Sequence, residues 1–441
     1  MKNISIKTAI PGPKSRALIA EWRKYEADTT GYQAQIVWDT GRDCLVTDVD
    51  GNRYIDWTSG VLVTNVGHCH PRLVAAVQES VAKLINNYEC PNTYRIEASK
   101  ALMSIAPKHF DKCFFFSAGS EATDMAIRMM KRRTGKFEVL SFESSFHGRT
   151  YCAASAGGLA GNKRGYGPTL PGSIRVAYPN PYRDELGFCN DGPHFKKYFA
   201  YVESVLAANS SGSLAGIIVE PYQGAGGFIF PPKGWLTALQ KWARERGLLI
   251  TVDEVQSGYG RTGKMFAIEH EGLTPDILTL GKGIGCGVPV SAIFATDDVL
   301  SVFSKGDMSS TLGGNPVSSS SVPVIIDIFK KEKLVDNSAK MGKYLATKLA
   351  AIAKSSKHIG SVRGMGLIHG VEFVKDKKTK APQDAVYIRK LIDCAAECGL
   401  LIGSVGRFGN VIRVAPPLTV TKALIDESCE AFTRAVKKAS S

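Results

Sequence analysis

Three short apolar runs, each ending at charged or glycine-flanked residues, constrain this chain more than any other feature. Residues 214–219 lead into Glu220, residues 247–252 lead into Asp253, and residues 276–280 lead into Gly281 and Lys282. Continuous apolar runs of this length are typical of strands covered on both faces, as in a parallel sheet between helices. Ligands bind such sheets at the carboxyl ends of the strands. We therefore expect Asp253 and Lys282 to face one cleft.

The pair of Asp253 and Lys282 admits two interpretations. A buried carboxylate and amine can form an ion pair that has only a structural role. The surrounding sequence favours a binding site, because glycines crowd Lys282 in segment 279–287 and let a ligand approach the backbone closely.

Composition and charge limit the class of protein. The 441 residues are 44% apolar, enough for a large core and two domains. No apolar run approaches the roughly 18 residues of a membrane-spanning helix. Ten cysteines without CxxC spacing indicate neither a zinc ribbon nor a disulfide framework, and they fit a reducing cytoplasm. The net charge of +14 is spread along the chain, so we expect small anionic molecules as ligands, and neither nucleic acid nor a membrane.

The order of predicted elements indicates an α/β fold with a mostly parallel sheet between helices and a smaller α+β domain. Residues 1–65 are expected to form an arm and a hairpin that pack with the small domain. Residues 66–315 are expected to form the large ligand-binding domain, in which strand 289–295 closes the sheet. Residues 316–441 are expected to form the C-terminal small domain. Residues 155–210 have weak periodicity and are expected to be loop-rich.

A second group of residues at the same sheet edge indicates an anion site. The predicted strand 112–116 is followed by small residues at 117–120 and by a helix, whose free amides favour an anion. A serine-capped helix with Glu121 in its first turn fits the same pattern. The next strand, 137–142, leads to Phe146 and Arg149, which can stack on a planar ligand and hold a carboxylate.

Other motifs in the sequence do not fit their usual functions. Segment 258–264 has the spacing of a nucleotide-binding P-loop, but Met265 stands where a serine or threonine binds magnesium. Segment 281–287 has the wrong spacing for a dinucleotide fingerprint. His68 and His70 are two positions apart, which does not suit a zinc site, and we expect no metal.

One cofactor needs the whole set of groups at this edge. Pyridoxal phosphate requires a phosphate cradle, a stacking partner, a carboxylate at its ring nitrogen and a lysine. Segments that contain these groups resemble those of the class III aminotransferases of fold type I, above all the 4-aminobutyrate and related ω-amino acid aminotransferases. The resemblance runs from about Val46 to Pro417 and rests on segments 119–122, 146–150, 220–224, 253–263, 280–283, 311–316 and 413–418.

The resemblance implies roles for the cofactor-binding residues. Lys282 and Asp253 would be catalytic, the first as the Schiff-base lysine that moves the proton and the second as the partner of the ring nitrogen. Val255 and Phe146 would enclose the ring, and Gln256 would reach its phenolic oxygen. Thr311 would contact the phosphate of the neighbouring subunit's cofactor, which implies a homodimer with shared sites or a tetramer. The complete set is Gly119, Ser120, Phe146, His147, Glu220, Asp253, Val255, Gln256, Lys282 and Thr311.

The resemblance also implies a substrate site made by Val61, Arg149, Glu220 and Arg413. Arg413 would bind the α-carboxylate of the 2-oxo acid, and Glu220 would pair with Arg413 when an ω-amine is bound. Arg149 would bind the distal carboxylate. Tyr222 and Ala225 depart from the family pattern, and Tyr222 is expected to narrow the pocket.

The expected function is transfer of an amino group from an ω-amino acid or amine, such as 4-aminobutyrate, to 2-oxoglutarate or pyruvate. Two alternatives remain open. One is an amino-acid racemase or epimerase that uses the same fold and cofactor. The other is a basic binding protein that has kept the fold without its chemistry.

Overall fold

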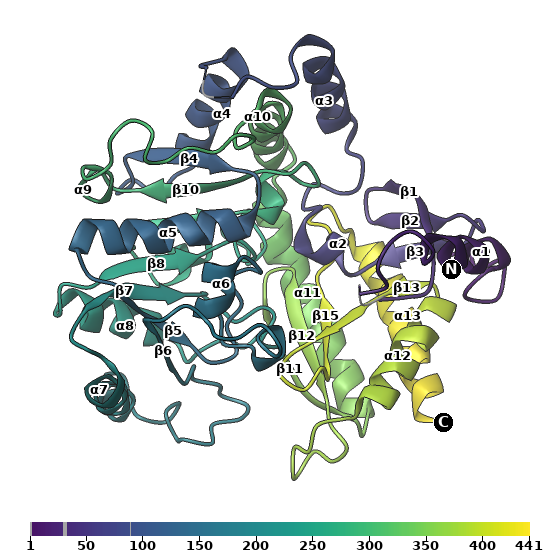
Figure 1. Ribbon diagram of the computed structural model, residues 1–441. Coiled ribbons are helices and arrows are strands. Elements are labelled where there is room, and N and C mark those ends of the chain that lie inside the picture. The colour runs from purple at the N-terminus through teal and green to yellow at the C-terminus, as the bar shows by residue number, and fades with distance from the viewer. Residues whose placement is uncertain (1, 30–32, 89) are drawn as a thin grey trace. The chain divides into compact units, whose positions relative to one another are not determined.

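The computed structural model describes residues 2–29, 33–88 and 90–441 and contains two compact units (Figure 1). The large unit consists of Arg72–Tyr259 and Lys264–Glu332, and the small unit consists of Met1–Pro71, Gly260–Gly263 and Lys333–Ser441. The predicted boundary at 315/316 lies before helix α10 (Pro316–Lys331), which here belongs to the large unit and packs on α4 (Thr93–Met103).

The large unit is built on a seven-stranded sheet with strand order β4-β10-β9-β8-β7-β5-β6. Its strands are β4 (Lys112–Phe116), β5 (Glu138–Phe142), β6 (Ser173–Val176), β7 (Leu214–Val219), β8 (Leu249–Asp253), β9 (Ile277–Leu280) and β10 (Ser291–Ala295). The pairs from β6 to β9 are parallel, and β10 is antiparallel to both β9 and β4. This arrangement confirms the predicted mostly parallel sheet.

The three apolar runs form strands β7, β8 and β9, as predicted, and every residue in them is buried. Helix α5 (Gly119–Thr134) lies along the sheet (Figure 1) and contacts β7, β8, β9 and β10. Its buried Met125 and Met129 belong to the same core cluster as Ile218 of β7 and Ile277 of β9. Burial on both faces explains why these strands lack alternation in sequence.

One expectation for the large unit is wrong. Strand β10 does not close the sheet, because β4 pairs with its outer side and occupies the edge. The stretch 155–210 is loop-rich, as expected, although it also contains β6 and helix α7 (Lys196–Asn209). Helix α7 buries only Tyr198 and Val202, so its apolar stripe is too narrow to be recognised from periodicity. The remaining helices of this unit are α3 (Pro71–Lys83), α6 (Tyr151–Ala156), α8 (Trp235–Arg244) and α9 (Asp297–Leu300).

The small unit contains two four-stranded sheets. The first has β1 (Trp38–Arg42), β2 (Leu45–Asp48), β3 (Arg53–Asp56) and β13 (Leu400–Leu401), and the second has β11 (Ile359–Met365), β12 (Ile368–Phe373), β15 (Val411–Val414) and β14 (Gly403–Val405). Strands β2 and β3 form the predicted hairpin, whose turn contains Gly51 at φ 80°. Strand β13 pairs in parallel with β3, so this sheet combines strands from the N-terminal and C-terminal parts of the sequence.

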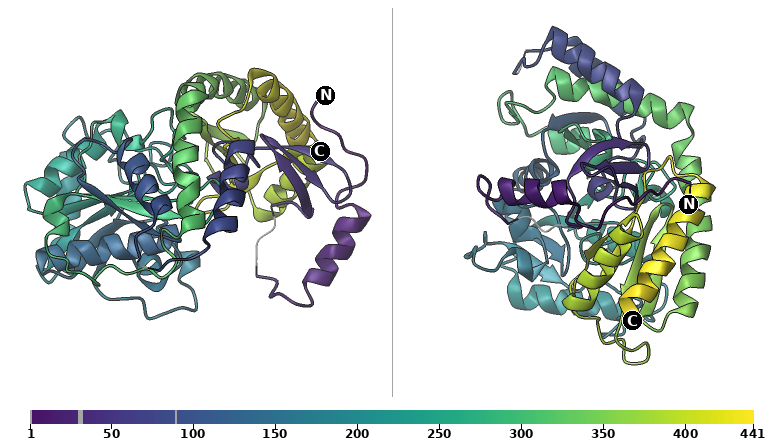
Figure 2. Two further views of the ribbon diagram at one scale, coloured as in Figure 1. Left: turned by 90° about the horizontal axis from the view of Figure 1, so that it is seen from above. Right: turned by 90° about the vertical axis from the view of Figure 1, so that its right-hand side faces the viewer.

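The described residues of the small unit also form α1 (Pro13–Trp22), α2 (Ser59–Leu62), α11 (Leu334–Ser355), α12 (Ala385–Glu397) and α13 (Lys422–Ser440). Helices α12 and α13 run side by side (Figure 2). In the part of the chain that is described, no helix combines the length and the apolar content needed to cross a membrane.

Candidate active site

A cavity of about 180 Å³ lies in the large unit at the carboxyl ends of its central strands. It is lined by Gly119, Ser120, Phe146, His147, Gly148, Glu220, Tyr222, Ala225, Asp253, Val255, Gln256, Ser257 and Lys282. The cavity therefore brings together every predicted cofactor-binding residue except Thr311. Thr311 belongs to the same unit and is exposed.

Asp253 is the last residue of β8 and is held by several hydrogen bonds. Its Oδ2 lies 2.7 Å from Nδ1 of His147, and both side chains are buried. Its Oδ1 accepts hydrogen bonds from the Val255 amide at 3.0 Å and from the Thr279 hydroxyl at 3.2 Å. Burial alone would lower the pKa of His147, but the hydrogen bond and charge of Asp253 outweigh burial and raise this pKa above its ordinary value.

Glu220 follows β7 and is anchored by two backbone amides. Its Oε1 accepts a hydrogen bond from the Phe146 amide at 2.8 Å, and its Oε2 accepts one from the Gly224 amide at 2.9 Å. Burial raises the pKa of Glu220 to about 7, although the nearby His147 opposes the rise. This carboxyl group therefore titrates close to neutral pH.

Lys282 lies in the glycine-rich loop that follows β9. Its backbone is in the left-handed region, at φ 49°, which is uncommon for a residue other than glycine. A Cβ atom at the preceding Gly281 would lie 2.9 Å from Cγ1 of Val255. The glycine therefore lets the lysine loop pass close to Val255.

The start of helix α5 has the features of an anion site. Ala118 is the N-cap residue, and no side chain caps the helix, which rules out the alternative of a serine-capped start. The first amides of a helix have no acceptor within the helix and are available to a ligand. A Cβ atom at Gly148 would lie 2.5 Å from Oγ of Ser120, so only glycine fits beside this helix start.

These groups fit pyridoxal phosphate. Two buried polar atoms of residues that line the cavity, Nε2 of His147 and Oε1 of Gln256, have no hydrogen-bond partner among the described residues. An unsatisfied buried polar atom is costly, so such atoms favour a polar ligand. The cavity also combines the amine of Lys282 and the carboxylate of Asp253 with the uncapped helix start.

Tyr222 and Ala225, which depart from the family pattern, both line the cavity. The Tyr222 ring is buried and stacks on Phe230, with 4.8 Å between ring centroids. Its hydroxyl donates a hydrogen bond of 3.4 Å to the Gln256 carbonyl. These contacts hold a large side chain at the wall of the cavity.

The predicted substrate residues other than Glu220 do not line this cavity. Arg149 is exposed, and its guanidinium lies 5.9 Å from the centroid of the Phe146 ring. Val61 and Arg413 belong to the small unit. Arg413 is only 5% exposed, and its Nε has no hydrogen-bond partner among the described residues. Burial lowers the pKa of Arg413 to about 10, although the charge of Asp56 opposes the change.

Sequence reasoning missed three contributors to the site. Gly148 and Ser257 line the cavity, and Thr279 supports Asp253 from the neighbouring strand β9. Thr279 lies within an apolar run, and a polar residue next to a strand end is the signal that points to it. The hydrogen bond of His147 with Asp253 joins distant segments, and no local sequence pattern indicates it.

Comparison with known proteins agrees with this geometry. The family described as aminotransferase class-III matches residues 27–436. An alanine/serine racemase of Pyrococcus horikoshii is 34% identical over 97% of this chain and 91% of its own length. A 4-aminobutyrate aminotransferase of Mycobacterium tuberculosis is 34% identical over 96% of each chain. The structure of the omega transaminase from Pseudomonas jessenii in complex with PMP has a TM-score of 0.89 and 29% identity, and covers 96% of this chain and 98% of that one.

The family match spans every segment that lines the cavity, and the two relatives cover 96–97% of this chain. The predicted fold type I is thereby confirmed, and a protein without catalytic chemistry is no longer a candidate. This chain belongs to the class III aminotransferases, a family of enzymes that depend on pyridoxal phosphate.

Proposed function

We propose that this enzyme moves an amino group from an ω-amino acid or amine, such as 4-aminobutyrate, to 2-oxoglutarate or pyruvate, with pyridoxal phosphate held covalently by Lys282. The observation that carries the proposal is the cavity where Lys282, the buried pair of Asp253 and His147, and the uncapped start of α5 meet. Family membership supports the reaction class, and the 4-aminobutyrate aminotransferase relative supports the donor class.

Each residue around the proposed cofactor would have a separate role. Pyridoxal phosphate, when bound, supplies a ring that withdraws electrons from the substrate carbon. Nζ of Lys282 would hold the cofactor and then take up and return the proton of the substrate carbon. The charge of Asp253 would favour a proton on the ring nitrogen. His147 and Thr279 would keep the Asp253 carboxylate oriented, because Nδ1 of His147 pairs with Oδ2 and the Thr279 hydroxyl donates to Oδ1.

Substrate recognition is assigned to Arg413, Arg149, Val61 and Glu220. Arg413 remains protonated at neutral pH even with its pKa lowered to about 10, so a carboxylate is the ligand that its buried charge favours. Glu220 titrates near neutral pH and can change its charge at small cost, which suits a group that must accommodate different substrates.

We further propose a homodimer with shared active sites, in which the exposed Thr311 contacts the partner's cofactor phosphate. Its other ligands would be small molecules, and its compartment would be the cytoplasm. The scattered spacing of the ten cysteines, which contain no CxxC pair, supports a reducing compartment.

The first experiment follows the visible absorption of the purified protein with bound pyridoxal phosphate. Addition of 4-aminobutyrate, other ω-amino acids, diamines or simple amines should bleach the absorption, and 2-oxoglutarate or pyruvate should restore it. The Lys282→Ala variant is the matched control and should show neither change. A protein that cannot take up the cofactor would overturn the proposal.

A racemase remains a second candidate, because an alanine/serine racemase is among the relatives. A racemase needs no oxo acid, whereas an aminotransferase does. Incubation of L-alanine with the enzyme in deuterated water, without oxo acid, separates the two functions. Formation of deuterated D-alanine would favour racemisation, and retention of the L-form would favour transamination.

A further inference from the structure

The turn that carries Val61 has an unusual backbone. Four consecutive residues have positive φ: Ser59 at 48°, Gly60 at 56°, Val61 at 67° and Leu62 at 63°. A left-handed turn is unfavourable for L-residues, and β-branched residues such as valine are the least suited to it. Strained backbone of this kind persists only where the surrounding structure enforces it, and it concentrates at functional sites.

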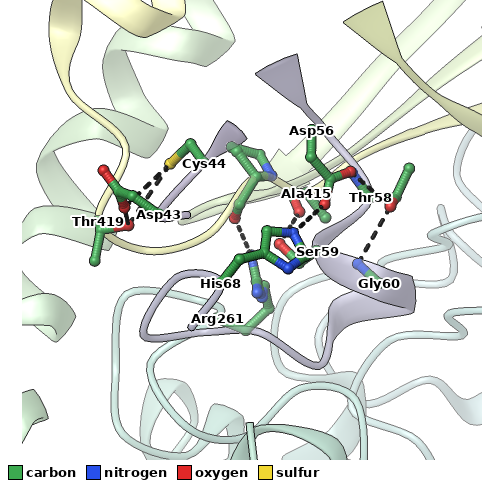
Figure 3. Close-up of polar contacts among 11 residues, drawn as sticks. Asp43, Cys44, Asp56, Thr58, Ser59, Gly60, His68, Arg261, Ala415 and Thr419 are labelled. Atoms are coloured by element: carbon green, nitrogen blue, oxygen red, sulfur yellow. Dashed lines mark hydrogen bonds and ion pairs between the residues drawn. The ribbon is translucent and has the colours of Figure 1, made fainter. Parts of the chain in front are cut away.

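Asp56 enforces this turn from within the small unit (Figure 3). Its Oδ1 accepts hydrogen bonds from both the amide and the hydroxyl of Thr58, each at 2.6 Å. The Thr58 hydroxyl in turn accepts a hydrogen bond from the Gly60 amide at 3.2 Å. Asp56 and Thr58 are fully buried, so solvent does not compete for these bonds.

The second carboxylate oxygen of Asp56 is also held in place (Figure 3). Its Oδ2 lies 2.9 Å from Nε2 of His68, whose backbone exchanges two hydrogen bonds with Asp43. The turn is also tied to the residue that follows strand β15, because the Ser59 hydroxyl donates to the Ala415 carbonyl at 2.6 Å. The start of the turn is therefore fixed by side-chain hydrogen bonds, while Val61 itself is 41% exposed.

We propose that Asp56 is a positioning residue that holds the left-handed turn Ser59–Leu62 through Thr58 and thereby fixes Val61 as a wall of the substrate site. The inference rests on the proposed function in one respect, the role of Val61 toward substrate. The hydrogen bonds of Asp56 and Thr58 that hold the turn, called the clamp below, do not depend on that role.

The experiment compares Asp56→Ala, Asp56→Asn and Thr58→Val. Asparagine keeps an acceptor for Thr58 and offers a donor to the His68 ring, whereas alanine offers neither. Thr58→Val keeps the side-chain shape and removes only the hydroxyl, so it carries the test if Asp56→Ala does not fold. The first readout is the ratio of kcat/KM for 1-phenylethylamine and 2-aminopropane, two amines of different bulk.

We expect Asp56→Ala and Thr58→Val to change this ratio about tenfold, the size expected for one hydrogen bond to a charged group. Asp56→Asn should stay within about twofold of the parent because its hydrogen bonds are retained. The visible absorption of the bound cofactor should be unchanged in all three variants. Equal loss for both amines, or equal effects of asparagine and alanine, would overturn the proposal.

The second readout needs no activity. The amides of Leu62 and Val63 donate hydrogen bonds to the carbonyls of Thr58 and Ser59, and their hydrogen exchange reports the opening of the turn. Exchange should accelerate in Asp56→Ala and Thr58→Val but not in Asp56→Asn. If exchange accelerates in these two variants but the parent protein transfers no amino group, the clamp is supported and the proposed function is refuted. Unchanged exchange in the Ala and Val variants would refute the clamp.

Discussion

Replacement of Val61 by glycine should give a more stable protein than replacement by alanine, the reverse of the usual order. At ordinary positions, a protein with glycine is less stable than one with alanine by about 0.5–1 kcal/mol, because glycine gives the unfolded chain more conformational freedom. Val61 has φ 67° and ψ 52°, where a residue with a Cβ atom costs roughly 1–2 kcal/mol more than glycine. Subtracting the first cost from the second leaves a net preference for glycine of about 0.75 kcal/mol, with extremes of about 0 and 1.5 kcal/mol.

The design compares two variants at one site, so the valine methyl groups are lost in both. Val81 is a matched control, because it is 43% exposed against 41% for Val61 and lies in the right-handed helix α3. At Val81, alanine should be more stable than glycine by about 1 kcal/mol. Urea denaturation of the four variants, monitored by circular dichroism, measures both differences. If alanine is also the more stable residue at position 61, the turn is not strained and the reasoning fails.

Three further predictions concern the cavity. Burial raises the pKa of Glu220 from 4.5 to about 7, so this group stabilises the fold below pH 4.5 and its contribution is lost as the pH rises through 7. Denaturation midpoints of Glu220→Gln should therefore depend less on pH than those of the parent, and Glu254, whose pKa burial also raises to about 7, should account for part of the dependence that remains. Tyr222→Val should raise kcat/KM for bulky amines relative to small ones by about tenfold, since it removes a ring from the cavity wall; an unchanged ratio would exclude Tyr222 as a determinant of specificity. Gly119→Ala would place a Cβ atom 3.0 Å from Cγ1 of Val255, so cofactor affinity, measured by fluorescence titration, should fall and should recover partly in the double variant with Val255→Ala. Additive losses in that double variant would show that the two residues act independently.

Local sequence patterns predicted the elements that carry the cavity. The runs before Glu220, Asp253 and Lys282 are continuous and apolar, because each strand is buried on both faces, and such runs can be recognised without knowledge of their neighbours. The roles at the strand ends came from the family resemblance and stay predictions until the enzyme is assayed.

The features that sequence did not reveal depend on distant partners or on unusual backbone. The edge position of β4 is set by pairing with β10, from a remote part of the chain. The contact of His147 with Asp253 has the same origin. The left-handed conformation of Val61 could not be expected from its residue type, since valine is among the residues least suited to positive φ.

The discontinuous small unit has a consequence for synthesis of the protein. Strand β3, near the start of the chain, pairs with β13, and Glu427 binds the backbone of Asn3 and Ile4. A chain emerging from the ribosome can therefore assemble the large unit once Glu332 has been made, whereas the N-terminal strands must wait for their partners at the far end. During that interval the hairpin of β2 and β3 exposes an open strand edge, which can pair with other chains unless it is covered.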